Sequence, residues 1–248
     1  MAENFGFTSE VIAGKKFKHQ MFRKQGRKQG QGKLLHVYIE GDGRPWHSRQ
    51  RVSLDPTPKN PLMLKLMATD PAPSVYLGRP CYFNLHDANC SPIWWTHKRY
   101  SEVVVSSLDN ALQRYATDYD GIILFGHSGG GTLAMLLAAM RTDVVALITL
   151  AGNLDIDAWA RHHRYSSLHG SINPAKQAPL SKTTLQQHYL GERDDNIKPD
   201  MIRTTIEQQY AAQFFLLKEI DHSCCWQTLW PDLLNKLERE LAKQRRDG

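Results

Sequence analysis

Long apolar runs and leader-like patterns are absent from the sequence. None of its 248 residues lie in a stretch that approaches the roughly eighteen consecutive apolar residues of a membrane-spanning helix. The N-terminal residues MAENFGFTSEVIAG lack the basic start and apolar core of a signal peptide. We therefore expect a cytoplasmic protein without a membrane span, although an envelope protein whose leader is missing would look the same.

Metal-binding patterns are absent as well. A structural zinc site needs close pairs of ligands, and the four cysteines do not provide two chelating pairs. None of the eleven histidines belongs to an HExxH motif, and no phosphate-binding loop with its lysine is present. We expect neither a metal ion nor an organic cofactor.

Cysteine is too scarce for a disulfide-dense scaffold. Cys81 and Cys90 lie nine residues apart, so they would form a bridge in an oxidising compartment and remain thiols in the cytoplasm. Cys224 and Cys225 are neighbours, and a bridge between neighbours is strained. We expect these two to be packing residues.

The charge is unevenly distributed along an otherwise ordinary composition. Hydrophobic residues make up 41% and charged residues 23%, as in soluble globular proteins, and the net charge is +6. Residues 1–51 hold eleven Lys/Arg against four Asp/Glu, which leaves the other 197 residues nearly balanced. We interpret this basic surplus as a solvated strand pair with a flexible Gln/Gly loop. The alternative is a basic arm that contacts an anionic surface, and without interleaved aromatic residues we expect no nucleic-acid partner.

Short apolar segments alternate with helical patterns along most of the chain. This alternation predicts crossover units on a mostly parallel sheet, with helices on both faces. The N-terminal segments 7–14 and 17–24 are expected to form an antiparallel entry, and residues 153–186 are polar and irregular. The predicted strands are 33–41, 74–80, 121–126, 144–152, 187–194 and 213–220, and the predicted helices are 60–69, 100–119, 130–141, 199–212 and 227–246.

The stretch Gly126-His127-Ser128-Gly129-Gly130 matches G-x-S-x-G and lies between a predicted strand and a predicted helix. A serine in a strained strand-to-helix turn is exposed at the end of the sheet. The backbone is crowded there, so the residues two before and two after the serine must lack a Cβ. Ser128 is therefore the predicted nucleophile, and an idle serine in a glycine-rich turn is the alternative.

A serine hydroxyl needs a base, and the base needs an acid that orients it. Reactive residues of a parallel sheet gather past the carboxyl ends of its strands. Asp194 and His222 follow two predicted strands, in the chain order Ser, Asp, His that such an elbow requires. Asp155 or Asp157, which follow an earlier strand, are the alternatives for the acid.

The oxyanion formed from an attacked carbonyl needs two hydrogen-bond donors. The backbone N–H of Gly129, directly after the nucleophile, is the first candidate. The second is the N–H of Asp42 in the segment IEGDGRPW, where the flanking glycines allow close approach of the main chain. The Asp42 carboxylate would oppose an oxyanion if it pointed inward, so we expect it to bind Arg44 or the indole N–H of Trp46 instead.

With these motifs together, the chain resembles the α/β-hydrolase superfamily over nearly its whole length. The elbow GHSGG, the acid loop GERDDNIKP and the histidine loop DHS carry the resemblance. Segments such as HVYIEGDGRPW and DHSCCW are similar to a poorly characterised bacterial subgroup of these serine hydrolases. The resemblance implies a single domain over residues 1–248, with a sheet of about seven or eight strands. It also implies a serine hydrolase without metal or cofactor, in which residues 153–186 form a short cap.

The leading hypothesis for the activity is hydrolysis of a small carboxylic ester through an acyl-enzyme intermediate. Trp159, His162 and His163 of the cap are candidates for lining a pocket there, and ordinary packing or a solvated surface position is the alternative. A thioesterase or a serine peptidase on the same fold is the first alternative, because a Ser-Asp-His set supports acyl transfer in general. The second is a non-catalytic binding protein on a hydrolase scaffold.

Overall fold

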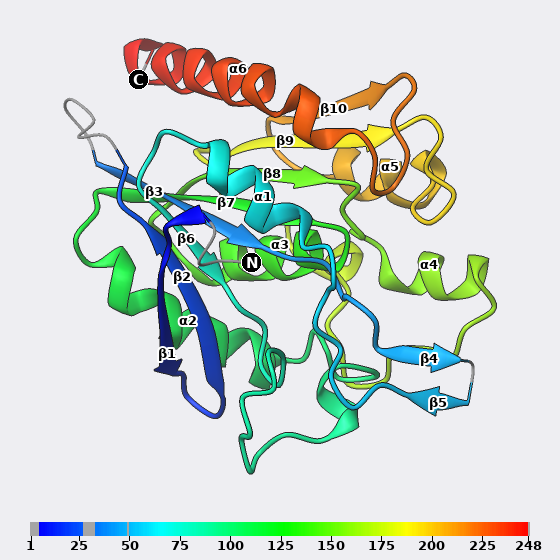
Figure 1. The fold of residues 1–248 in the computed structure, drawn as a ribbon. Helices are drawn as coiled ribbons and strands as arrows, with labels where there is room; N and C mark the ends of the chain where they lie inside the picture. The colour runs from blue at the N-terminus through cyan, green and yellow to red at the C-terminus, as the bar shows by residue number, and fades with distance from the viewer. Residues whose placement is uncertain (1–4, 27–32, 49, 248) are drawn as a thin grey trace.

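The structure is a computed structural model that describes residues 5–26, 33–48 and 50–247. Its main sheet has eight strands in the order β1-β2-β6-β3-β7-β8-β9-β10 (Figure 1). The pairs β1/β2 and β2/β6 are antiparallel, and every other neighbouring pair is parallel. The strands are β1 (Thr8–Ala13), β2 (Lys18–Lys24), β3 (Leu34–Ile39), β6 (Ser74–Leu77), β7 (Gly121–His127), β8 (Val144–Leu150), β9 (Leu185–Gly191) and β10 (Ala212–Leu217). The predicted mostly parallel sheet is confirmed.

Helices cover both faces of this sheet, which explains why every residue of the central strands β3 and β7 is buried. Helices α1 and α6 contact each other on one face, while α2 and α3 contact each other on the opposite face (Figure 1). Ser101 begins α2 as predicted, since its side chain accepts the Val104 N–H. The helices are α1 (Leu62–Thr69), α2 (Glu102–Ala116), α3 (Gly129–Met140), α4 (Ile156–His162), α5 (Pro199–Glu207) and α6 (Trp226–Asp247).

Several parts of the sequence prediction need correction, among them the predicted helix 199–212, which ends at Glu207. The polar segment predicted as irregular contains helix α4, which Asp155 begins by accepting the N–H groups of Asp157 and Ala158. A helix of only seven residues is too short for its periodicity to stand out in the sequence. Strand β9 begins at Leu185, and its buried glutamines hid the start from a prediction based on apolar runs.

A short hairpin was not predicted either. Strands β4 (Trp46–Ser48) and β5 (Arg51–Val52) form a separate two-stranded sheet after β3. Figure 1 shows this hairpin on the same side of the molecule as α4. Neither strand is long enough to produce an alternating pattern.

The basic N-terminal segment includes β2. Two of its lysine side chains contact other parts of the structure and are not simply solvated. Lys24 Nζ donates to the carbonyl oxygens of Met67 and Ala68 at 3.3 and 2.8 Å. Lys16 Nζ lies 4.7 Å from the centre of the Trp94 ring. The predicted Gln/Gly loop, residues 27–32, lies outside the described residues, so contact with an anionic surface stays a prediction. No helix within the described ranges is both long enough and apolar enough to cross a bilayer.

The cysteines are paired in the structure. Cys81 and Cys90 form a disulfide with a Cα–Cα distance of 5.5 Å, which lies within the usual range. Cys224 and Cys225 are also bonded to each other, contrary to the expectation that they would pack as free thiols. They lie in the turn after Asp221, whose carboxylate accepts the Cys224 N–H at 2.7 Å.

We expect the variant Cys90→Ser to lower the free energy of unfolding by about 2–3 kcal/mol, because the bridge to Cys81 restricts a short loop in the unfolded chain. Urea unfolding of protein prepared without reductant measures this difference. The same comparison in dithiothreitol is the control, since the reduced wild type should then resemble the variant. Equal stability of both proteins without reductant, or an intact mass unchanged by reduction, would contradict the prediction.

Candidate active site

Ser128 occupies a strained turn between β7 and α3, with φ 53° and ψ −121°. A Cβ placed on Gly126 would lie 2.4 Å from the carbonyl oxygen of Gly130. A Cβ placed on Gly130 would lie 2.2 Å from the carbonyl oxygen of Ile39 in the neighbouring strand β3. Both positions therefore require glycine, for the crowding reason that the sequence motif predicts.

We expect Gly130→Ala to destabilise the protein by about 3 kcal/mol, or about 6–12 °C in Tm, because the methyl group collides with backbone that cannot rotate away. Gly41→Ala is the matched control, since its Cβ would meet no atom closer than 3.3 Å. Circular dichroism melts of the two variants test the prediction. A Tm of Gly130→Ala equal to that of Gly41→Ala would show that the elbow tolerates a side chain.

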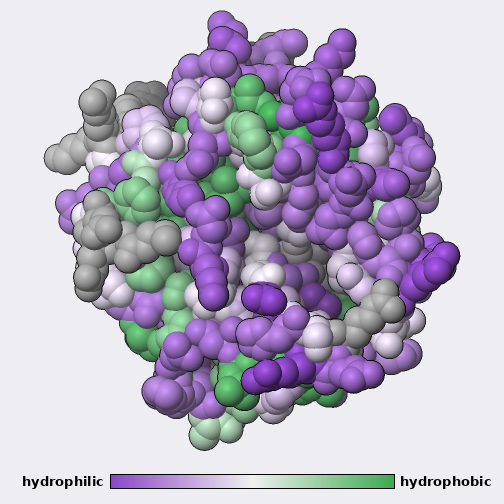
Figure 2. Space-filling view, turned by 45° about the vertical axis from the view of Figure 1, so that its right-hand side comes forward, coloured by the Kyte–Doolittle hydropathy of each residue, from purple (hydrophilic) through white to green (hydrophobic). Residues whose placement is uncertain are grey.

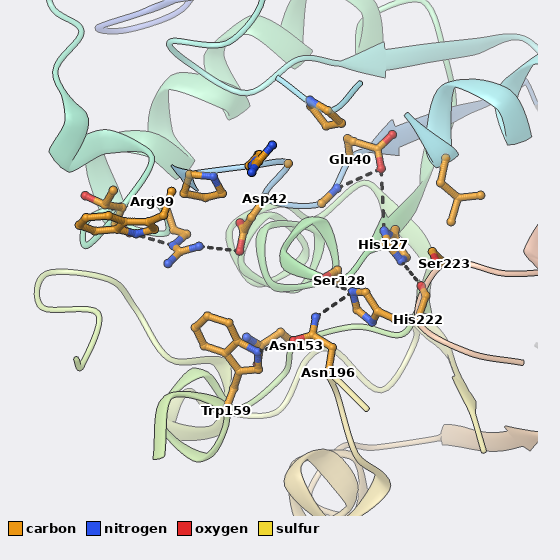
Figure 3. A pocket seen from close by; sticks show the side chains of 18 of the residues that line it. Glu40, Asp42, Arg99, His127, Ser128, Asn153, Trp159, Asn196, His222 and Ser223 are labelled. Carbon is orange, nitrogen blue, oxygen red and sulfur yellow. Dashed lines mark hydrogen bonds and ion pairs between the residues drawn. The ribbon is translucent and has the colours of Figure 1, made fainter. Parts of the chain in front are cut away.

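The structure brings the three predicted catalytic side chains together (Figure 3). Ser128 Oγ lies 3.0 Å from His222 Nε2, and His222 Nδ1 lies 2.9 Å from Asp194 Oδ2. The other carboxylate oxygen of Asp194 accepts the backbone N–H groups of Asn196 and Ile197, each at 2.8 Å. Because Asp194 is buried and fixed by these bonds, it holds the imidazole with Nε2 directed at the serine.

The alternative acids lie elsewhere and have other partners. Asp155 accepts backbone N–H groups at the start of α4 and also contacts the amide of Asn173 at 2.8 Å. Asp157 forms an ion pair with Lys176 at 2.6 Å. Neither carboxylate has a hydrogen bond to His222, which leaves Asp194 as the candidate acid.

The loop after β3 runs beside the elbow, as predicted for the second oxyanion donor. A Cβ on Gly41 would lie 3.4 Å from Ser128 Cβ. The Gly41 N–H donates to the carboxylate of Glu40 at 3.2 Å, so this donor is occupied. The N–H groups of Asp42 and Gly129 donate to no acceptor among the described residues. Both predicted oxyanion donors are thus free within the described part of the chain, and Gly129 adds the positive end of helix α3.

The Asp42 carboxylate is held by positive side chains, but these partners differ from those predicted. It binds Arg99 at 2.8 Å (Figure 3) and Arg79 at 2.5 Å, not Arg44 or Trp46. Arg79 follows β6, which lies beside β3 in the sheet although it is distant in sequence. The ion pair forms because β6 and β3 are neighbours in the sheet, which cannot be predicted from the residues around Asp42.

Tyr100 completes the environment of Asp42. Its hydroxyl donates to the carboxylate, with distances of 2.8 and 2.6 Å to the two oxygens. Burial would raise the pKa of Asp42, but Arg99, Arg79 and Tyr100 together outweigh it and lower that pKa to about 2. A Cβ on Gly129 would lie 2.3 Å from both the carboxylate and the Tyr100 hydroxyl. Gly129 is therefore glycine because this ionised carboxylate packs directly against it.

Comparisons with known proteins identify the fold that carries this site. No protein-family model matches the sequence, and no curated protein matches it either. The solved structure of an alpha-beta serine hydrolase homologue from Coxiella burnetii matches with a TM-score of 0.62 and 12% identity, over 94% of this chain and 97% of that one. The Pyrococcus furiosus esterase matches with a TM-score of 0.62 and 11% identity, over 98% and 95%. The chain has the α/β-hydrolase fold.

A third match adds a different activity among the neighbours that share this α/β-hydrolase fold. A puromycin-hydrolyzing peptidase from Mycobacterium tuberculosis has a TM-score of 0.65 and 12% identity, over 98% of this chain and 39% of that one. The neighbours thus include an esterase and a peptidase. The predicted fold is confirmed, while similarity to one bacterial subgroup stays a prediction.

His127, which directly precedes Ser128 in the elbow, is hydrogen-bonded to the loop that carries His222. Its ring Nε2–H donates to the carbonyl oxygen of His222 at 2.8 Å. Burial lowers the pKa of His127 to about 4, so the ring is neutral at pH 7. Its Nδ1 faces Glu40 Oε1 at 3.8 Å, and burial raises the pKa of that carboxyl to about 7. Because a carbonyl only accepts, the proton of the neutral ring must lie on Nε2, which ties the elbow to the loop of His222.

The sequence prediction missed Asn196, whose side chain also reaches the histidine (Figure 3). Its Nδ2 lies 2.9 Å from His222 Nε2, the atom that also faces Ser128. The indole N–H of Trp159 donates to Asn196 Oδ1 at 3.0 Å, and His163 contacts the Asn196 carbonyl oxygen at 2.8 Å. Trp159 therefore fixes the amide with its N–H groups toward His222. The position two residues after the acid was the available signal, but the link to α4 is visible only in the fold.

A cavity of 770 Å³ opens above these groups at the carboxyl ends of β3 and β7. The segment between β8 and β9 contributes Trp159, Arg164 and Tyr165 to its wall. His162 and His163, the other two predicted lining residues, do not contact the cavity. Figure 2 shows that hydrophilic side chains predominate on the face turned forward in that view, which carries α4 and the β4–β5 hairpin. The cavity is thus large enough for a small or medium organic molecule.

Proposed function

We propose that the protein is a serine hydrolase that cleaves carboxylic esters through an acyl-enzyme intermediate. The observation that carries the proposal is the continuous chain of contacts from Ser128 Oγ to His222 Nε2 at 3.0 Å and from His222 Nδ1 to Asp194 at 2.9 Å. This chain ends in a cavity that can hold a substrate. The neighbours named as serine hydrolase homologue and esterase support the same class of reaction.

In the first step, Ser128 Oγ attacks the ester carbonyl carbon while His222 Nε2 takes the hydroxyl proton. The imidazolium that forms is stabilised by Asp194, which accepts the Nδ1–H. Negative charge develops on the former carbonyl oxygen. The N–H groups of Asp42 and Gly129 would donate hydrogen bonds to this oxygen, and the positive end of α3 adds to the stabilisation.

In the second step, the tetrahedral intermediate collapses and the carbon–oxygen bond to the alcohol breaks. His222 returns the proton to the departing oxygen, which leaves an acyl group on Ser128. Water then attacks this acyl group with His222 again as the base, and the acid product leaves with Ser128 restored. Each proton in the cycle moves between the serine, the histidine, water and the substrate, so no further cofactor takes part.

Esters are favoured over amides on energetic grounds, because an alkoxide or phenoxide leaves more readily than an amine. The residues between β8 and β9 act as a short cap over the cavity, in keeping with a small acyl group. They place Arg164 and Trp159 at its wall and lack a long apolar helix that would shelter a fatty chain. Acetyl to octanoyl esters are therefore the expected range.

A series of p-nitrophenyl esters from acetate to palmitate, with matched anilides and thioesters, tests the proposal. We expect kcat/KM to be highest for short or medium chains and at least about 10²-fold lower for the anilides. Labelling with a fluorophosphonate should modify Ser128 alone. A rate that rises steadily to palmitate would indicate a lipase, anilides cleaved as fast as esters a peptidase, and preferred thioesters a thioesterase. The absence of both turnover and labelling would indicate a binding protein.

A further inference from the structure

The cavity above Ser128 is lined by more positive than negative side chains. Four cationic residues contribute to its wall, namely Arg44, Lys65, Arg99 and Arg164. Two acidic residues, Glu40 and Asp42, also contribute. The sign of the charge that a bound molecule meets depends on which of these six groups are already neutralised by the protein.

Both acidic residues are occupied by other parts of the fold. Asp42 forms ion pairs with both Arg79 and Arg99, so its single negative charge is fully balanced and Arg99 already has an acidic partner. Glu40 is 4% exposed, and its two oxygens accept the backbone N–H groups of Gly41 and Met63. Asp42 therefore offers no unpaired negative charge to a molecule in the cavity. Glu40 is buried and bonded to the main chain, and because burial raises its pKa to about 7, it is only partly ionised at pH 7.

Within the described part of the chain, the three remaining cations have no acidic partner. Among the described residues, no carboxylate oxygen lies within 4 Å of the side-chain nitrogens of Arg44, Lys65 or Arg164. The Lys65 ammonium donates to the side-chain amide oxygen of Asn60, which leaves its charge uncompensated. The arginines are exposed and Lys65 is half-buried.

These cations reach the cavity from three separate parts of the chain. Arg44 belongs to the loop after β3, Lys65 to helix α1, and Arg164 follows helix α4. Arg164 has a left-handed backbone, φ 55°, just after the end of α4. Positive charge therefore surrounds the cavity from three elements and is not confined to one helix or loop. A cleft lined by one sign of charge focuses its field and raises the local concentration of oppositely charged molecules.

We propose that the natural substrate is an ester that carries an anionic group, with a carboxylate as the chemistry best suited to the arginines. This inference rests on the proposed function, since it names the substrate class of the same site. A carboxylate can accept paired N–H groups from a guanidinium and can also bind an ammonium group. The anionic group would interact with Arg44, Lys65 or Arg164, while the ester carbonyl lies between Ser128 and its oxyanion donors.

A matched pair of esters tests this proposal. The probes are meta-butyryloxybenzoate and meta-butyryloxybenzamide, which share the acyl group and differ in one negative charge. Each enzymatic rate is divided by the hydroxide-catalysed rate of the same ester to remove the difference in intrinsic reactivity. We expect kcat/KM for the carboxylate to exceed that for the amide by about tenfold at low salt, mainly through KM. Added sodium chloride should reduce this preference because it screens the cations.

The triple variant Arg44→Gln/Lys65→Gln/Arg164→Gln removes the three unpaired charges and should reduce the preference to about one. Arg161→Gln is the matched control, since Arg161 is an exposed residue of α4 that does not line the cavity. It changes the net charge in the same way as each single substitution and should retain the preference. Melting curves of each variant establish that it is folded before the rates are compared.

The possible results separate the inference from the proposed function. A carboxylate preference that disappears in the triple variant and persists in Arg161→Gln supports the inference. Equal rates for the two esters, or a preference that the triple variant retains, overturn it while leaving Ser128-dependent ester hydrolysis intact. If neither ester is cleaved and a fluorophosphonate does not label Ser128, the proposed function and the inference that rests on it both fail.

Discussion

The variant Ser128→Ala is expected to lower kcat/KM for p-nitrophenyl butyrate by about 10³-fold or more, with little change in Tm. The serine is the group that forms the bond to the substrate, and alanine leaves the histidine without a proton to abstract. Residual turnover would come from the oxyanion donors and from binding alone. Because only one oxygen is removed and the backbone keeps its conformation, the fold should be retained. Stopped-flow or steady-state assays measure the loss.

Ser166→Ala is a suitable control, since Ser166 is an exposed serine that also lines the cavity. It should keep wild-type turnover and should still react with a fluorophosphonate at Ser128. Mass spectrometry of the labelled peptide identifies the modified residue. A label on any other serine, or turnover retained by Ser128→Ala, would remove Ser128 from its proposed role.

The variant Asp194→Asn is expected to lower kcat by about 10³ to 10⁴-fold. The carboxylate accepts the His222 Nδ1–H, which keeps Nε2 unprotonated and able to act as a base. An asparagine can present its NH₂ group to Nδ1 instead, which favours the opposite tautomer of the ring. Nε2 would then carry the proton and could not take one from Ser128. Asparagine can still accept the N–H groups of the loop, so the variant should fold.

Asp155→Asn and Asp157→Asn are the matched controls for this prediction. Asparagine begins a helix nearly as well as aspartate, so Asp155→Asn should preserve α4. Both controls should keep kcat within about threefold of the wild type, because neither residue contacts His222. A larger loss in a control than in Asp194→Asn would move the acid to the strand before α4.

The elbow illustrates how much of the site a local pattern can predict. The glycines at 126 and 130 are required by contacts with each other and with the adjacent strand, and the motif anticipates this crowding. The order of serine, acid and histidine past successive strand ends also follows from a parallel sheet, so the proximity of Ser128, Asp194 and His222 was predictable. Their catalytic roles remain predictions that the substitutions above test.

The environment of Asp42 was less predictable. Its backbone lies in the expected loop, yet its side chain pairs with Arg79 and Arg99, which are 37 and 57 residues away in sequence. Such pairs depend on which strands become neighbours, and many arginines in the chain were equally plausible partners. The role of Asn196 was equally hard to predict, since Trp159, which orients its amide, lies 37 residues away in sequence.

Periodicity and glycine placement by themselves determined the α/β architecture, the elbow and the positions of the candidate triad. These features depend on local backbone preferences and on the spacing of apolar residues within each segment. Both can be recognised from residues that are close in sequence. Only the tertiary structure decided which carboxylates are neutralised and which cations remain unpaired around the cavity. Ion pairs and long-range hydrogen bonds form between residues that folding brings together. The net charge around a bound substrate therefore depends on the folded arrangement. The sequence shows which charged residues are present but not which of them pair.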